Sequence, residues 1–228
     1  MKDASQDNNK KIKVFVKIML KHSKKNSNTT LNAFIFILVT MLTACSTTKV
    51  ATDQQLFQNK SQRAEQLSKL NNWTIKGKIA FIEGDSKQSA NLYWRQTQHT
   101  TNLKLTTFLG VNVLSLSSED NIHILKANGK TYQDDNLEDL LNQVAGVRLP
   151  VNALVYWIKG LKAQHEDQIT YSATTNLPET LNAWVNNTYW QLHYQKYHLV
   201  NNLRLANQLT IKHQQLVIKM AIHTWELN

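Results

Sequence analysis

Residues 73–95 read WTIKGKIAFIEGDSKQSANLYWR, and two runs inside this stretch alternate between apolar side chains and other side chains. The apolar positions of the two runs are Trp73, Ile75, Ile79 and Phe81, then Ala90, Leu92 and Trp94. A period of two is typical of a β-strand that turns one face to a core, because successive side chains point to opposite faces. The stretch therefore predicts two antiparallel strands.

Further segments of the chain have the same period. The next strand candidates are centred on Leu103 with Leu105, on Val113 or Leu114 with Leu116, and on Ile122 with Ile124. In the second half of the chain they lie at residues 168–172, 184–187, 189–194, 208–212 and 216–225. Asn128-Gly129 is a favoured tight hairpin turn. Because the chain has only six Gly and two Pro, its other hairpins must rely on Asn and Asp.

Three segments have helical patterns instead. The apolar residues of the first recur at near-helical spacing and are Leu56, Phe57, Ala64, Leu67 and Leu70. In the second, Asp135 and Glu138 form a capping box ahead of an apolar run that stops at Gly146. Pro150 then opens a further apolar segment at residues 151–158. Many short strands with one helical pair among them predict a mainly β fold, in which a single antiparallel sheet curls around helices.

The N-terminus has the order of features found in a signal peptide. A Lys-rich segment precedes residues 31–42 (LNAFIFILVTML), which carry no charge, and Thr43, Ala44 and Cys45 follow. A transmembrane anchor is the alternative, but a span needs roughly 18 to 20 apolar residues and this run has about a dozen. We therefore predict a lipoprotein signal peptide over residues 1–44.

The start of translation has two interpretations. Met19 begins a segment with a basic start and an ordinary signal-peptide length, so residues 1–18 are either a miscalled extension or a long basic leader. The sequence leaves both open.

Residues 42–45, Leu-Thr-Ala-Cys, resemble the lipobox of bacterial lipoproteins, in which the cysteine thiol receives a diacylglyceryl group. Cys45 is the only cysteine of the chain, so it has no partner for an intramolecular disulfide. The resemblance implies an N-acyl and S-diacylglycerol lipid on Cys45, and two or three acyl chains suffice for stable anchoring. Ser46 in place of Asp implies sorting to the outer membrane. We predict a lipidated tether at residues 45–53 and a single domain at residues 54–228.

The net charge of +10 is unevenly distributed. Residues 1–30 contain eight Lys and two acidic residues, a net charge of 8 − 2 = +6. From Cys45 onward there are 18 Lys plus Arg and 14 Asp plus Glu, a net charge of 18 − 14 = +4 without a basic run. Nucleic-acid binding needs such a run or patch, so we expect no nucleic-acid partner.

The sequence offers little for catalysis, metals or cofactors. Residues 46–49 (STTK) match the Ser-x-x-Lys of penicillin-binding enzymes, but the companion motifs are missing and the match adjoins the tether. The closest His pair of the mature chain, His193 and His198, has an odd spacing that separates strand faces. His123 lies between two Ile residues and is interpreted as solvated. We expect a protein that is not an enzyme and that has no metal and no cofactor.

Aromatic residues are frequent on the predicted strands and helices. Each one is most simply a core residue. Together, on a sheet too small for a second core, they are also compatible with the lining of an apolar cavity. The candidate cavity residues are Trp73, Trp94, Leu105, Trp157, Trp190 and Tyr194.

The segment Phe108-Leu109-Gly110 is apolar where a polar turn is expected between two strands. Either it is a bulged strand that crosses the core, or it is a loop that exposes Leu109 to a membrane. The pattern does not choose between the two.

Several segments resemble the LolB family in their order and spacing. They are NWTIKGKIA at 72–80, LYWRQ at 92–96, LTTFLG at 105–110, residues 146–160, Tyr189 with Trp190, and residues 216–227. The resemblance spans nearly all of the chain from Cys45 onward. It implies an incomplete antiparallel β-barrel, covered by about three helices, that encloses an apolar cavity.

The LolB resemblance also implies a function. Members of this outer-membrane family accept the acyl chains of lipoproteins from the periplasmic carrier LolA and insert the lipoproteins into the inner leaflet of the outer membrane. A projecting loop has a leucine needed for insertion, and Leu109 matches it, with Phe108 and Gly110 beside it. Two departures, Thr107-Phe108 in place of a more polar Asn-Pro pair and Leu205 in place of a proline, affect the expected loop geometry more than the function.

Two further hypotheses belong to other classes. One is a structural envelope lipoprotein, which would scaffold other proteins through a sheet edge and have a solid aromatic core. The other is an envelope hydrolase, which would need a catalytic cluster that the sequence does not provide. We expect a monomer anchored by lipid at the periplasmic face of the outer membrane.

Overall fold

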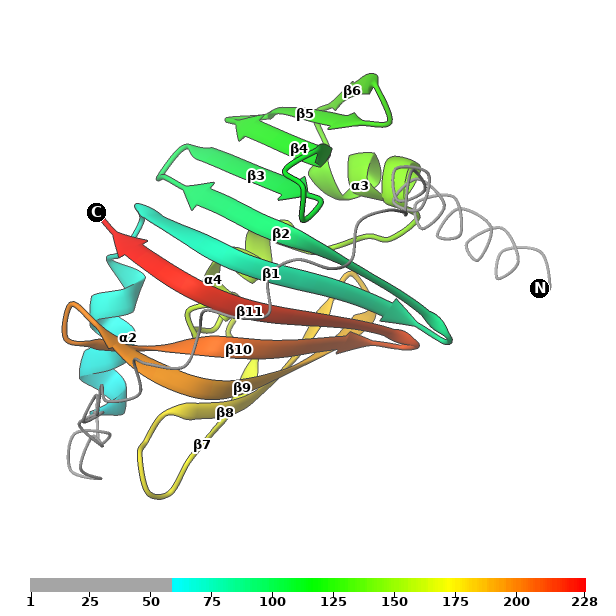
Figure 1. The fold of residues 1–228 in the computed structure, drawn as a ribbon. Coiled ribbons are helices and arrows are strands. Elements are labelled where there is room, and N and C mark those ends of the chain that lie inside the picture. Colours follow the sequence, from blue (N-terminus) through cyan, green and yellow to red (C-terminus); the bar gives the residue numbers. More distant parts are fainter. Residues whose placement is uncertain (1–58) are drawn as a thin grey trace, which may run out of the picture.

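The computed structural model describes residues 59–228, which form one curled antiparallel sheet with three helices (Figure 1). The predicted signal peptide, the predicted lipidation site Cys45 and the predicted tether lie outside the described residues. So does the beginning of the first helix predicted from Leu56 and Phe57.

The sheet has eleven strands in the described residues, and neighbouring strands are antiparallel throughout. They are β1 (Trp73–Glu83), β2 (Ser86–Gln96), β3 (Thr100–Thr106), β4 (Asn112–Glu119), β5 (Ile122–Ala127), β6 (Lys130–Asp134), β7 (Gln168–Tyr171), β8 (Pro178–Val185), β9 (Thr188–Val200), β10 (Leu203–His213) and β11 (Leu216–Leu227). Their order in the sheet is β6-β5-β4-β3-β2-β1-β11-β10-β9-β8-β7. The first and last of these strands in the chain, β1 and β11, are therefore neighbours near the middle of the sheet (Figure 1).

The sheet curls without closing into a barrel. Its edge strands β6 and β7 are not paired with each other. The helices α3 (Leu137–Ala145) and α4 (Val151–Trp157) follow β6 in the chain and lie on one side of the curled sheet (Figure 1). A third helix, α2 (Lys60–Ser68), lies near the end of the sheet where β9 and β10 meet (Figure 1). The predicted fold class, an incomplete antiparallel barrel covered by about three helices, is confirmed.

The predicted alternation holds in β1 and β2 but has the opposite phase in β5. Ile122, predicted to face inward, is 55% exposed, whereas Leu125 is fully buried. The apolar run of β5 fits either phase, and its pairing decides between them, because Leu125 lies opposite the buried Leu116 of β4. His123 shares the face of Leu125 and is half-buried, and its Nδ1 lies 2.6 Å from the hydroxyl of Ser118. Its interpretation as a solvated residue was wrong.

The β10–β11 turn has Gln214 in the left-handed conformation (φ 50°), but most of the other hairpins use Asn and Asp, as predicted. Seven of these residues adopt the left-handed backbone conformation, which short polar side chains tolerate better than most others. They are Asp120, Asn128, Asn176, Asn186, Asn187, Asn201 and Asn202. Asn186 and Asn187 form the turn between β8 and β9, so the strand predicted at 184–187 ends earlier, at Val185.

The helix ends follow local capping chemistry. The N-cap of α3 is Asn136, one residue after the predicted Asp135, because the side-chain oxygen of Asn136 accepts the N–H groups of Glu138 and Asp139, both at 3.1 Å. Gly146 ends α3 at φ 73°, as predicted. Pro150 occupies the N-cap position of α4.

Buried polar side chains fix α2 in place. Arg63 donates from Nε to the carbonyl oxygen of Arg204 (3.0 Å) and from Nη2 to that of Lys159 (2.8 Å). The Lys159 ammonium donates to the carbonyls of Leu67 (3.1 Å) and Leu70 (2.9 Å), at the C-terminal end of α2, where helix carbonyls lack partners. Burial lowers the pKa of Lys159 to about 8. These bonds join α2 to β10 and to the residues that follow α4.

Candidate functional site

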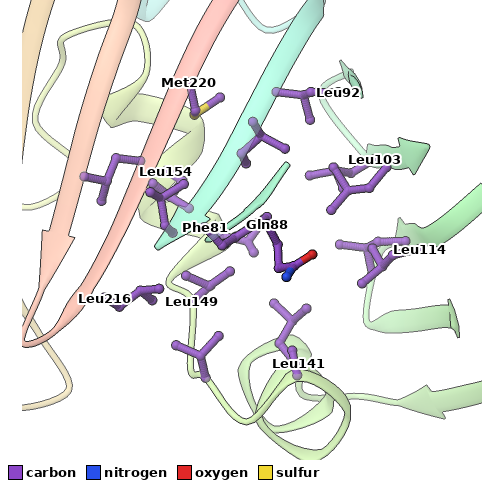
Figure 2. Close-up of a pocket in the computed structure, with 18 of the residues that line it drawn as sticks. Phe81, Gln88, Leu92, Leu103, Leu114, Leu141, Leu149, Leu154, Leu216 and Met220 are labelled. Atoms are coloured by element: carbon purple, nitrogen blue, oxygen red, sulfur yellow. The ribbon is translucent and has the colours of Figure 1, made fainter. Parts of the chain in front are cut away.

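An apolar hollow lies between the curled sheet and the two helices α3 and α4 (Figure 2). Its empty volume is about 1170 Å³, counted with the space at its opening. All but three of the lining residues are apolar or aromatic. The lining consists of Ile79, Phe81, Ile82, Glu83, Ser86, Gln88, Leu92, Trp94, Leu103, Leu105, Leu114, Leu116, Leu141, Ala145, Val147, Leu149, Val151, Leu154, Ile211, Leu216, Ile218 and Met220.

The hollow exists because the curvature of the sheet keeps opposing apolar side chains apart. Leu92 and Met220 come from neighbouring parts of the sheet, while Leu141 and Leu154 come from the helices on the other side (Figure 2). Protein interiors are otherwise close-packed, with few voids larger than a water molecule. A space of this size with so few polar groups offers water few partners and suits an apolar ligand.

The opening lies between the β1–β2 hairpin and the segment after α3. The lining residues of the central strands, such as Leu105, Leu114 and Leu116, are buried. The half-exposed ones gather on the hairpin from Phe81 to Gln88 and at Val147 and Leu149, with Leu103 as the exception. The hollow is therefore accessible from solvent between the hairpin and the segment that joins α3 to α4.

Two of the six predicted cavity residues, Trp94 and Leu105, line the hollow. The other four are buried elsewhere. Trp73 packs against Trp94 and Trp225, with ring centroids 5.2 and 5.8 Å apart. Trp190 stacks on His213 at 4.7 Å.

Trp157 and Tyr194 are held by buried hydrogen bonds outside the hollow. The Trp157 indole N–H donates to Asp167 Oδ2 at 2.8 Å, and the Tyr194 hydroxyl donates to the Trp157 carbonyl at 2.8 Å. Burial raises the pKa of Tyr194 well above its usual range. These hydrogen bonds hold Trp157 and Tyr194 in the solid part of the core, and aliphatic residues line most of the hollow. The placement of these four aromatics in the cavity is corrected accordingly.

Sequence reasoning missed most of the aliphatic lining. Ile79 and Leu92 were recognised as inward-facing, but they were not assigned to a cavity. Leu149 lies just before α4, Leu154 lies in α4, and Leu141 lies on the apolar stripe of α3. The available signal was the inward phase of the strands combined with the apolar stripes of the two helices.

The segment Phe108-Leu109-Gly110 forms an exposed loop between β3 and β4. Phe108 is 87% exposed and Leu109 is 71% exposed, which excludes the alternative of a strand crossing the core. The Gly110 N–H donates to the Thr107 carbonyl at 3.0 Å, and Gly110 has φ 82°. Val111, after the turn, donates to the Thr107 hydroxyl at 3.2 Å. This loop, residues 107–111, is therefore a structured turn that presents Phe108 and Leu109, and to a lesser extent Val111, to solvent.

The loop connects directly to the hollow. Leu105, two residues before it, and Leu114, three residues after it, both line the hollow. The Asn91 amide of β2 donates to the Thr107 carbonyl at 2.9 Å and fixes the base of the loop to the sheet. An apolar cavity and an exposed apolar tip are thus parts of one continuous hairpin, β3–β4.

The described residues contain no helix that is long and apolar enough to cross a membrane. Within residues 59–228, three or more His, Cys, Asp or Glu side chains do not gather into a metal-binding group. The described site is therefore suited to binding apolar chains by burying them in the hollow.

Residues 71–225 match the family model described as "Outer membrane lipoprotein LolB". The chain belongs to the LolB family. Similar relatives are called outer-membrane lipoprotein LolB in three organisms. The protein of Pseudoalteromonas translucida is 36% identical over 68% of this chain and 76% of its own length. The protein of Shewanella woodyi is 31% identical over 85% of this chain and 87% of its own length. The protein of Aeromonas salmonicida is 33% identical over 86% of this chain and 97% of its own length. The match to LolB thus includes β1 to β10, most of β11 and both helices around the hollow.

Proposed function

We propose that this LolB-family protein accepts the acyl chains of lipoproteins in its hollow and inserts the lipoproteins into the outer membrane. The observation that carries the proposal is the junction of an open apolar hollow with an exposed apolar loop on the hairpin β3–β4. The hollow suits the acyl chains, and the loop suits contact with the membrane that receives them. The names of the relatives, which are outer-membrane lipoproteins, agree with this location.

The free energy of exposing acyl chains to water explains why they must stay shielded from water during transfer. Three chains with roughly 45 methylenes would cost of order 35 kcal/mol to expose to water, at about 0.8 kcal/mol each. Such cargo must pass from one apolar cavity to another. Transfer then follows differences in affinity, without a covalent step, and the protein acts as a receptor rather than an enzyme.

The proposed donor is the periplasmic carrier LolA, and the proposed anchor is the lipid on Cys45. Cys45 precedes the described residues by a short tether, so the anchor fixes the protein to the membrane while leaving the hollow unchanged. The protein then works as a monomer at the periplasmic face of the outer membrane.

Leu109 is proposed to act after the cargo has been accepted. A leucine at a loop tip enters the headgroup region of a bilayer favourably, and the neighbouring Phe108 adds to this effect. Contact of the loop with the bilayer would bring the connected hollow close to the membrane surface.

The scaffold hypothesis expects a solid aromatic core. The described core contains an open apolar hollow between the sheet and the helices α3 and α4 instead, so this hypothesis lacks support.

Transfer from the carrier tests the proposal. A Cys45→Ala protein has no lipid of its own and is incubated with lipoprotein bound to LolA, followed by affinity capture of each partner. We expect the lipoprotein to move to the Cys45→Ala protein. If it stays on the carrier at every ratio of the two proteins, the receptor function is wrong.

A further inference from the structure

The three polar residues that line the hollow lie together on one hairpin. Glu83 ends β1, Ser86 begins β2, and these two residues are paired across the β1–β2 turn. Gln88 lies two residues further along β2, on the same inward face, opposite Phe81. We call these three residues the polar lip. They are half-exposed, so they lie at the opening of the hollow.

The Gln88 amide is available for a ligand. Figure 2 shows its amide end directed into the hollow. No residue of the described range 59–228 forms a hydrogen bond with this side chain. An amide has two N–H donors and a carbonyl acceptor, so Gln88 brings unused hydrogen-bonding groups to an otherwise apolar wall.

The hollow itself cannot distinguish one acyl chain from another. The gain from burying a methylene is the same whether the chain belongs to a lipoprotein or to a membrane phospholipid. Any selection between them must therefore come from the head group, which remains at the opening when the chains are inside. The polar lip is the part of the lining that meets this head group.

We propose that the polar lip selects the head group of the ligand: it binds the uncharged ester and amide groups of an N-acyl, S-diacylglyceryl cysteine and disfavours the phosphate of a phospholipid. This inference rests on the proposed function. Gln88 and Ser86 donate to ester and amide carbonyls that have lost water on entering the hollow. A buried acceptor without a donor is costly, so these bonds favour a ligand whose carbonyls lie at the lip.

The charges at the opening explain why a phosphate is disfavoured there. Glu83 is the single charged residue among the lining residues, and it is an anion. Lys87 is exposed, and its odd spacing from Ser86 and Gln88 directs it to the opposite face of β2. Arg148, near the opening, is exposed and paired with Asp139 at 2.7 Å. A phosphate at the lip therefore meets a carboxylate, whereas an uncharged ester does not.

The test uses three ligands and the purified Cys45→Ala protein. The ligands are the fluorescent apolar probe N-phenyl-1-naphthylamine, a synthetic tripalmitoyl-cysteine peptide and monomeric short-chain phosphatidylglycerol. Gln88→Met preserves the volume of the side chain and removes its hydrogen bonds. We expect this variant to bind the lipopeptide about five- to tenfold more weakly and to bind the apolar probe within about twofold of the parent.

A second variant tests the charge. Glu83→Gln should bind phosphatidylglycerol about two- to fivefold more tightly at low salt, because one repulsion between like charges is removed. Ser89→Met, on the outward face of the same strand, is the matched control and should change none of the three affinities.

Different outcomes would refute the role of the polar lip and the proposed function. If Gln88→Met leaves the affinity for the lipopeptide unchanged, the polar lip does not bind the head group. The same conclusion follows if Gln88→Met lowers the affinities for the lipopeptide and for the apolar probe by equal factors. If Glu83→Gln does not alter phosphatidylglycerol binding, its role in rejecting phosphate is wrong. A parent protein that binds neither the lipopeptide nor the apolar probe would instead overturn the proposed function.

Discussion

Leu109→Glu should strongly reduce delivery of lipoprotein to membranes and leave the fold intact. The side chain is 71% exposed at the tip of the loop 107–111, so its substitution removes little packing within the protein. An acidic residue at this tip would resist entry into the headgroup region, whereas leucine gains free energy there. The hollow is lined by other residues, so acceptance of cargo should continue.

The magnitudes follow from the exposure of the loop. Full burial of a leucine side chain gains about 1.5 to 3 kcal/mol, so the 71% of Leu109 that is exposed gains roughly 1 to 2 kcal/mol on entering the bilayer. This corresponds to about a 5- to 30-fold change in membrane affinity. The effect on the free energy of unfolding should remain within about 0.5 kcal/mol, or roughly 1 to 2 °C in Tm.

The assay measures three quantities on one preparation: Tm, transfer of lipoprotein from the carrier, and delivery to liposomes. Leu199→Glu is the matched control, because Leu199 is also exposed, at 55%, but lies next to the β9–β10 turn, at the opposite end of the sheet. We expect normal delivery from the control. A drop in Tm that corresponds to several kcal/mol would show that Leu109 is a core residue, and normal delivery by Leu109→Glu would show that the loop is not needed.

Three further predictions concern the strand pairing, the anchor and pH. Gly77→Ala should destabilise the protein by about 2 to 4 kcal/mol, measured by urea denaturation, because a Cβ at Gly77 would lie 2.1 Å from the Ala221 carbonyl oxygen of β11; unchanged stability would contradict the tight β1–β11 contact. Mass spectrometry of the mature protein should find an acylated Cys45 at its N-terminus, and an unmodified cysteine would refute lipidation. The pKa of Lys159 is lowered to about 8 in the folded protein, so the unfolded chain binds more protons above that pH, and stability should rise between about pH 8 and 9.5. Lys159→Met should lose this rise, and the same pH profile in both proteins would argue against the shift.

The sequence predicted the elements well because their signals are local. Alternation in residues 73–95 identified β1 and β2, and the Gly146 stop and the Asn-rich turns followed from backbone chemistry that does not depend on the rest of the fold. β5 was assigned the wrong phase because its apolar residues occur at both odd and even positions. The inward face there depends on the partner strand, which the local sequence does not show.

The site was harder to predict because a hollow depends on tertiary curvature. The alternation predicted that Leu92 and Ile79 face inward. An inward-facing side chain either packs against an opposing side chain or lines a cavity, and the curvature of the sheet decides which. The aromatic residues were a poor guide, since Trp157 and Tyr194 are fixed by hydrogen bonds in the solid part of the core. Leu109 was left undecided between core and loop by its pattern, and its exposure in the structure decided between them.

The central claim is that the hollow receives the acyl chains of the cargo, and site-specific photocrosslinking tests it most directly. Leu103 lines the hollow, and the next residue of β3, Lys104, is exposed on the outward face. A photoreactive amino acid is placed at each position in turn, and each protein receives lipoprotein from the carrier before illumination. We predict crosslinks from position 103 to the acyl chains of the lipoprotein and none from position 104. Equal crosslinking at both positions, or crosslinking at position 104 alone, would contradict the account.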